Sequence, residues 1–231
     1  HTHGEQERPP QRSAGIRNVV FDRVEQFHPA LVVPDVEAMV RRADGLYISR
    51  QFRAAASQYE EAATKGKNTE EAQYAAYQAG QAAYRGGELE RASDLMRKFI
   101  QRFPKSRLAD DAMYMIGWVA FQKQDDEGAI REFERLLKAY PDGDHAVRAL
   151  YTIADAYYNL GSYDQSIATY RSVMSQYPSH PLASEAAKSL QEVLVGQGRM
   201  DEALSVLDTL IGANPESIAA EDFTCSKAQI F

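Results

Sequence analysis

The sequence lacks several features that mark membrane, disulfide-rich and nucleic-acid-binding proteins. It contains one cysteine, Cys225, so neither an internal disulfide nor a cysteine-ligated zinc site is expected. No run approaches the ~18 apolar residues that a membrane-spanning helix requires. Basic residues number 26 against 33 acidic ones, and the resulting net charge of −7 argues against a nucleic-acid partner. The hydrophobic content of 44% is nevertheless typical of a globular chain.

The sequence motifs of common enzymes are missing as well. There is no Gly-rich phosphate loop, no Gly-x-Ser-x-Gly and no His-Glu-x-x-His. His28, His145 and His180 fall in predicted connections that lie far apart along the chain, so we do not expect them to converge. We therefore predict a non-enzymatic protein with no catalytic residues, no metal site and no cofactor.

What the sequence does contain is a repeat of 37 residues. Self-similarity at a fixed period of this size is the signature of a stack of one supersecondary unit. Three columns of residues keep the interval: a proline at Pro104, Pro141, Pro178 and Pro215; a small residue at Ala92, Ala129, Ser166 and Ala203; and a large one at Met96, Phe133, Tyr170 and Leu207.

Each unit has the pattern of a helical hairpin. Around Pro104, the pattern begins with Thr69 as a candidate helix cap and continues with apolar residues at helical spacing. Gly86-Gly87 then breaks the helix, and the second helix continues until Pro104, which cannot be accommodated in a helix interior. By the same spacing, we expect Ser106 to cap the next unit and Pro181 to begin the last one. The turns between paired helices are predicted at Gly87, Gln124, Gly161 and Gly198.

A degenerate unit precedes the others, so we count five hairpins. It has Ala43, Tyr47 and Tyr59 in the corresponding columns and lacks the terminal proline. We expect residues 34–215 to form an all-α, right-handed superhelical solenoid. Residues 1–33 are predicted to be a partly disordered tail and an arm, and residues 216–231 a C-terminal cap or tail. Because the chain begins at His1, we expect that a secretion signal, a cloning boundary or a longer natural region lies upstream.

The spacing within one unit resembles that of the tetratricopeptide repeat (TPR) family. Gly80, Ala92, Met96 and Pro104 match the small, alanine, large and proline positions of that repeat, although the family unit is usually 34 residues. Tyr114-Met-Ile-Gly-Trp-Val-Ala-Phe121, Tyr140-Pro141 and Tyr177-Pro178 are similar to repeats of bacterial envelope proteins of the CpoB (YbgF) and BamD types. This resemblance implies a periplasmic or outer-membrane-associated protein, with a cytoplasmic location as the alternative.

In TPR folds, the first helix of each hairpin lines the concave face, which implies a set of candidate binding residues. Tyrosine and tryptophan are common at binding hot spots, and an aromatic groove suits an extended peptide or a helix. The alternative role of the repeated tyrosines is to pack one helix against another. Arg148 either binds a carboxylate of the partner or forms an ion pair at the surface. The candidates are Tyr77, Tyr84, Tyr114, Trp118, Phe121, Arg148, Tyr151, Asp155 and Tyr158.

These observations predict a protein–protein interaction scaffold that holds an envelope-associated protein or peptide in its concave face. The alternative is an accessory protein that binds a small ligand in an aromatic pocket near Trp118.

Overall fold

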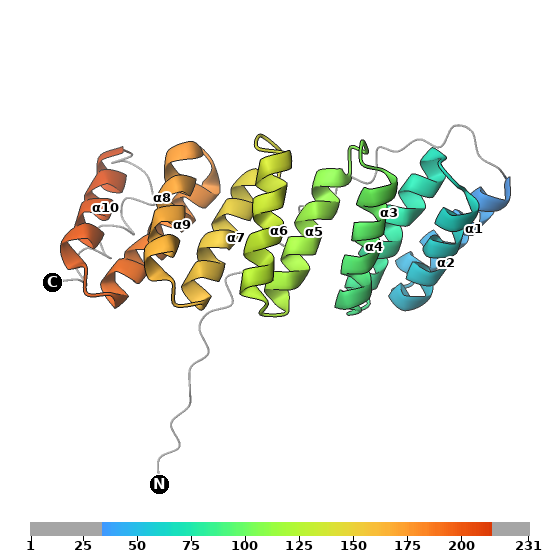
Figure 1. Cartoon of the computed structure of the whole chain (residues 1–231), viewed down its shortest axis with the longest axis horizontal. Coiled ribbons are helices and arrows are strands. Elements are labelled where there is room, and N and C mark those ends of the chain that lie inside the picture. The colour runs from blue at the N-terminus through green and yellow to red at the C-terminus, as the bar shows by residue number, and fades with distance from the viewer. Residues whose placement is uncertain (1–33, 214–231) are drawn as a thin grey trace, which may run out of the picture.

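The computed structural model describes residues 34–213, and within them the chain is entirely helical and loop. The expected arm at residues 1–33 and the expected cap at residues 216–231 lie outside the described residues. The helices form five antiparallel hairpins placed side by side along one axis (Figure 1). They are α1 (Pro34–Ile48), α2 (Phe52–Lys65), α3 (Glu70–Arg85), α4 (Leu89–Arg102), α5 (Ala109–Gln122), α6 (Asp126–Ala139), α7 (Ala146–Asn159), α8 (Tyr163–Gln176), α9 (Pro181–Gly196) and α10 (Met200–Ala213).

The turn inside each hairpin contains one residue in the left-handed region of φ. The four predicted turn residues all adopt it, and the sequence reading missed a fifth, Arg50, at the same position of the first hairpin. Glycine suits this conformation because it has no Cβ, whereas a side chain there is strained. The φ values are +58° at Arg50, +77° at Gly87, +62° at Gln124, +71° at Gly161 and +71° at Gly198.

Two of the three expected helix starts are confirmed. The Thr69 hydroxyl accepts a hydrogen bond from the Ala72 N–H at 3.2 Å, and Pro181 is the first residue of α9. The expected cap at Ser106 is wrong, because α5 begins at Ala109 and Ser106 accepts instead from the Leu108 N–H within the preceding turn. This later start places the buried Leu108 against the core of the second hairpin.

In the second and third hairpins, the two helices pack through a small residue on the first helix and a large one on the second. A methyl group on Gly80 would lie 2.6 Å from Cε of Met96, and one on Gly117 would lie 2.7 Å from Cε1 of Phe133. Met96 and Phe133 are fully buried, and they contribute to the core between their own hairpin and the next. The close approach predicted from the small positions is therefore present.

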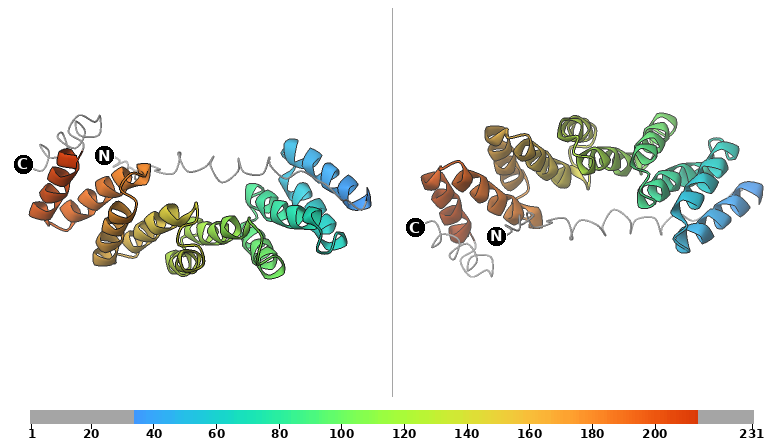
Figure 2. Two further views of the ribbon diagram at one scale, coloured as in Figure 1. Left: turned by 90° about the horizontal axis from the view of Figure 1, so that it is seen from above. Right: turned by 90° about the horizontal axis from the view of Figure 1, so that it is seen from below.

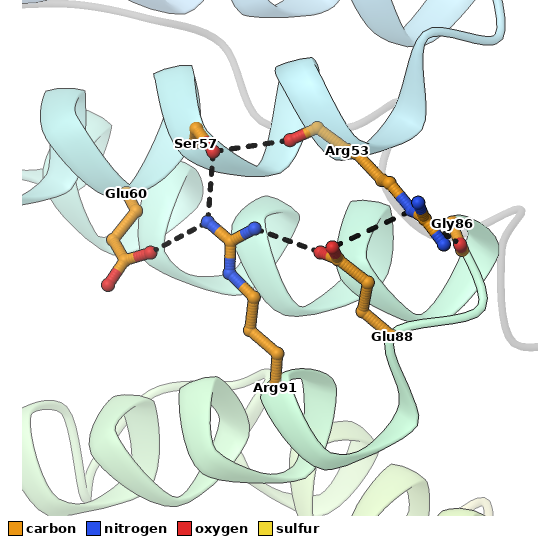
Figure 3. Close-up of polar contacts among 6 residues, drawn as sticks. All are labelled: Arg53, Ser57, Glu60, Gly86, Glu88 and Arg91. Carbon is orange, nitrogen blue, oxygen red and sulfur yellow. Dashed lines mark hydrogen bonds and ion pairs between the residues drawn. The ribbon is translucent and has the colours of Figure 1, made fainter.

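Polar contacts connect the second helices of neighbouring hairpins. Arg91 on α4 donates to the Ser57 hydroxyl at 3.0 Å and the Glu60 carboxylate at 3.1 Å, both on α2, and to Glu88 at 2.9 Å (Figure 3). Arg53 on α2 also lies 3.6 Å from Glu88. Similar ion pairs occur farther along the stack, at Arg97–Glu132, Asp164–Arg199 and Arg171–Glu202. Because these pairs are partly exposed, each contributes little to stability. We infer that their main role is to align neighbouring hairpins with one another.

The stack is curved, with the first helices of the hairpins on its inner side (Figure 2). Contacts between non-consecutive helices join first helices of neighbouring hairpins: α1 with α3, α5 with α7, and α7 with α9. The odd-numbered helices are therefore closer together than the even-numbered ones and form the concave face. Within residues 34–213, no helix is both long and apolar enough to cross a membrane.

The two close glycine contacts predict different outcomes for the same substitution. Gly117→Ala pushes a methyl group into the rigid Phe133 ring, so we expect the free energy of unfolding to fall by about 1–3 kcal/mol. Gly80→Ala meets the flexible end of Met96, which can move, and alanine gains about 1 kcal/mol of helix propensity. Urea denaturation of both variants tests this packing, and an equal or larger loss for Gly80→Ala would contradict it.

Candidate functional site

The predicted binding residues lie on the concave helices but fall into a buried and an exposed group. Tyr77, Tyr114 and Tyr151 occupy the same position of α3, α5 and α7, and they are 1%, 2% and 6% exposed. Their rings pack against Phe99, Phe133 and Tyr170 on the second helices. These three tyrosines therefore pack helix against helix, the alternative that the sequence left open.

The hydroxyl groups of these tyrosines differ in their partners. Tyr77 accepts a hydrogen bond from the Gln81 side chain at 2.6 Å, and the Tyr151 hydroxyl lies 3.1 Å from that of Ser189. The Tyr114 hydroxyl is equally buried but has no hydrogen-bond partner. Burial raises the pKa of both Tyr77 and Tyr114 above the ordinary tyrosine value, because it disfavours the charged phenolate.

A second aromatic column, seven residues farther along each first helix, is partly exposed. Two turns of helix separate the columns, so both lie on one face of each helix. Tyr158 is 49% exposed, and the guanidinium of Arg85 lies 5.6 Å from the centre of the Tyr47 ring. The column consists of Tyr47 on α1, Tyr84 on α3, Phe121 on α5 and Tyr158 on α7. We call it the aromatic column.

Trp118 connects the two groups in the middle of the concave face. Its Nε1–H donates to the Tyr84 hydroxyl at 2.9 Å, which links α5 to α3. The indole is nearly parallel to the Tyr114 ring, with centroids 6.4 Å apart, and lies 5.8 Å from the Phe121 ring. Trp118 is partly exposed, so it presents apolar surface with its polar atom already bonded. We call Trp118, Tyr84 and Phe121 the Trp118 cluster.

Two carboxylates on the concave helices pair with tyrosines, a pairing that the sequence reading missed. Tyr59 donates to Asp44 at 2.5 Å, and Tyr170, three repeats later, donates to Asp155 at 2.5 Å. Tyr74 also donates to Asp44, and burial beside this carboxylate raises the pKa of Tyr74 to about 12. The Asp155 carboxylate is therefore at least partly used in holding α8 against α7.

A buried polar pair joins the third and fourth hairpins. Nε2 of His145, at the start of α7, lies 2.5 Å from Oδ1 of Asp111 on α5, and both side chains are nearly inaccessible. The imidazole stacks on the Tyr114 ring with centroids 4.5 Å apart. Within the described residues, no group of three or more metal-ligating side chains surrounds this pair or occurs elsewhere.

Arg148 on α7 is partly exposed on the concave face. The two carboxylates that the sequence placed beside it, Asp111 and Asp155, bond to His145 and Tyr170. Among residues 34–213, Arg148 has no side-chain hydrogen bond or ion pair. Its charge is nevertheless felt nearby, because it opposes the rise that burial causes in the pKa of Tyr114.

A small hollow of about 290 Å³ lies between the turns of the fourth and fifth hairpins. It is away from Trp118, so it does not provide the aromatic pocket that the small-ligand alternative requires. Its lining consists of Gly161, Ser162, Tyr163, Asp164, Gln165, Gln197 and Arg199.

The different partners of Tyr77 and Tyr114 predict different effects of removing one oxygen atom. Tyr77→Phe leaves the Gln81 amide without its acceptor, so we expect a loss of about 1–2 kcal/mol in the free energy of unfolding. Tyr114→Phe removes a hydroxyl that has no partner, so stability stays the same or rises by up to about 1 kcal/mol. Urea denaturation compares the two, and a loss in Tyr114→Phe as large as that in Tyr77→Phe would show that the Tyr114 hydroxyl is bonded.

Several solved structures share this fold at low sequence identity. YrrB, described as a TPR protein with an unusual peptide-binding site, is 20% identical, with a TM-score of 0.55 over 80% of this chain and 89% of YrrB. A MamA structure is 19% identical, with a TM-score of 0.61 over 84% of this chain and 94% of MamA. MamA from Desulfovibrio magneticus RS-1, from residue 41 to its end, is 17% identical, with a TM-score of 0.60 over 79% of this chain and 97% of that one. These similarities confirm the TPR-type solenoid.

Family membership follows from the sequence match. No curated protein sequence matches the chain. A family model described as "YfiO: Outer membrane lipoprotein" matches residues 36–128 and 120–223, which together include all five hairpins. The expected resemblance to TPR proteins of the bacterial envelope is confirmed, and the chain belongs to the YfiO family of outer membrane lipoproteins.

Proposed function

We propose that the protein is a non-enzymatic scaffold of the bacterial envelope that binds a segment of a partner protein in its concave face. The observation that carries this proposal is the partly exposed aromatic column along four consecutive first helices, with the Trp118 cluster at its centre. A TPR-type solenoid supports protein–protein interaction in general, and the exposed aromatic side chains locate the proposed contact.

The Trp118 cluster has the physical properties of a binding anchor. Its rings are large and already held in place by contacts with one another, so little conformational freedom is lost when a ligand covers them. The indole N–H is bonded to Tyr84, so an apolar group can cover the ring without leaving a buried donor unpaired. We therefore propose that an apolar or aromatic side chain of the partner packs on Trp118.

The proposed binding residues are those of the candidates predicted from the sequence that a ligand can reach on the concave face. They are Tyr84, Trp118, Phe121 and Tyr158, with Arg148 on α7. Tyr77, Tyr114, Tyr151 and Asp155 support them from beneath through the packing and hydrogen bonds described above.

The envelope location rests on the family match. The matching family is one of outer membrane lipoproteins, and this supports a periplasmic or outer-membrane-associated protein with an envelope-associated partner. Fractionation of cells that carry the native gene tests the location: recovery with the membrane or periplasmic fraction is expected, and recovery in the cytoplasm would contradict it.

Replacing the anchor tests the mode of binding. Peptides selected from a displayed random library for binding to the wild-type chain should lose about 2 kcal/mol of affinity, or roughly 30-fold in Kd, when Trp118 is replaced by alanine. Trp118→Phe should retain part of this affinity because the apolar face is kept. Isothermal titration calorimetry of the selected peptides gives the Kd values.

Met200→Ala is the matched control. Met200 is also an exposed apolar residue, 41% accessible, but it begins α10 on the second helix of its hairpin. Its replacement should leave the Kd unchanged. Equal affinity of the peptides for wild type and Trp118→Ala would remove Trp118 from the binding surface.

A further inference from the structure

The link between the second and third hairpins is far more basic than the equivalent links of the repeat. Residues 97–107 contain five basic residues and no acidic one. The equivalent residues 60–70 and 134–144 each contain two basic and three acidic residues, and residues 171–181 contain one basic residue and no acidic one. All four segments form the end of a second helix and the link that follows it. Because the other three links form without such a charge, the hairpin itself does not require it.

Two of these five cations are already paired within the chain, and two are not. Arg97 lies 2.8 Å from Glu132, and Arg107 also has a partner. Lys98 and Lys105 are exposed, and within the described residues their side chains form no hydrogen bond or ion pair. Two positive charges of this link are therefore available to a partner, besides that of the fifth cation.

The fifth cation, Arg102, connects this surface with a lysine of the preceding link. Its guanidinium donates to the Lys67 carbonyl and lies 4.9 Å from the centre of the Phe103 ring, and neither contact neutralises its charge. Lys98 lies four residues before Arg102 on α4, so the two side chains share a face of the helix. We call these exposed cations the basic edge, which consists of Lys67, Lys98, Arg102 and Lys105.

The basic edge destabilises the folded chain in two ways. Like charges four residues apart on a helix repel one another, as Lys98 and Arg102 do. Lys67 has a φ of +52°, in the left-handed region where glycine is unstrained and a side chain is not. Since the fold neither needs these cations nor gains stability from them, they indicate a binding surface.

The basic edge lies at the ends of the hairpins, away from the concave groove. The links between hairpins lie along one long edge of the stack, and the turns inside the hairpins lie along the opposite edge (Figure 1). Lys67 and Lys105 belong to two successive links, and Lys98 and Arg102 to the last two turns of α4. The cations are thus spread along an edge that an extended, flat partner can approach.

We propose that the basic edge is a second binding surface, which contacts the anionic headgroups of a phospholipid bilayer. This inference goes beyond the proposed groove and uses only the proposed envelope location, which supplies the bilayer. Lipid phosphates are anions spread over a plane, and they match cations spread along an edge. In lipoproteins, such a surface adds a second attachment to that of the lipid chain. The family match implies a membrane but assigns no surface of the folded repeats to it.

The net charge of −7 does not prevent this contact. Exposed charges more than about 10 Å apart are largely screened at about 0.1 M salt, so the local charge of the basic edge governs its interaction with a bilayer. An acidic protein segment would pair with the same cations. The bilayer is favoured because the cations extend over two links at an outer edge and because the chain belongs to a family of membrane-attached proteins.

Flotation of vesicles with the full 231-residue chain tests the proposal. The vesicles contain phosphatidylcholine alone or phosphatidylcholine with phosphatidylglycerol, each at low and at high salt. The test variant combines Lys67→Gly, Lys98→Gln and Lys105→Gln, and it leaves Arg102 with its contacts in place.

The control variant combines Arg50→Gly, Lys123→Gln and Arg131→Gln. It removes three exposed cations near the opposite edge, so the net charge changes by the same amount. Arg50 has a φ of +58°, so its replacement by glycine matches that of Lys67 in backbone strain as well.

We expect the wild-type chain to bind the anionic vesicles at low salt and to bind the neutral vesicles weakly. Each cation near an anionic bilayer contributes about fivefold to partitioning, so the test variant should lose about 100-fold in its partition coefficient. The control variant should keep most of the binding, and high salt should weaken all of it. Thermal denaturation should show the test variant to be at least as stable as wild type, because strain and like-charge repulsion are removed.

Equal binding of the wild-type chain to the two kinds of vesicle, or an equal loss in the two variants, would overturn the proposal. Binding to a polyglutamate peptide without binding to anionic vesicles would also overturn it and identify an acidic protein segment as the partner. The test variant should bind the groove peptides as wild type does. Failure of vesicle binding therefore leaves the groove intact, and an unchanged affinity in Trp118→Ala leaves the basic edge intact.

Discussion

The close contact between a small residue on the first helix and a large residue on the second, seen in the second and third hairpins, is the constraint on which the stack depends. At Gly117 there is no room for a methyl group against Phe133, so the spacing of α5 and α6 is fixed by the absence of a side chain. The large residue also reaches the core shared with the next hairpin. Repetition of the hairpin every 37 residues produces a stack whose helices share their cores with the next hairpin.

The concave face combines structural positions and proposed binding positions on the same helices. Buried tyrosines near the middle of each first helix hold the hairpins together, and the aromatic column two turns farther on remains partly exposed. Trp118 bridges the two levels, since its ring contacts Tyr114 beneath and its N–H bonds to Tyr84 on the neighbouring hairpin. A rigid apolar surface is thus available at the centre of the solenoid, which is where a partner segment gains the largest contact with neighbouring hairpins.

Much of the fold was predictable from the sequence because the residue pattern of one hairpin recurs several times, so each feature is indicated at several positions. The period, the turn residues and the small positions gave five hairpins and their core. The start of α5 was not predictable from Ser106, because burial of Leu108 outweighed a local cap. The pairing of Asp155 with Tyr170 was also missed, although the sequence contains a signal for it. The hairpins with a tyrosine in the large column also have an aspartate at one position of the first helix, and Asp44 and Tyr59 form the same pair in the first hairpin. The gaps at Arg148 and Tyr114 required the contacts themselves, since sequence spacing does not show which side chains lack a partner.

The account depends most on the concave face as the place where a partner binds. Hydrogen–deuterium exchange of the full chain, with and without a peptide selected for binding, locates that place directly. We expect added protection in α3, α5 and α7, around Tyr84, Trp118 and Tyr158, with little change in α4, α6 and α8. Protection confined to the even-numbered helices would contradict the account and place the binding surface on the convex side.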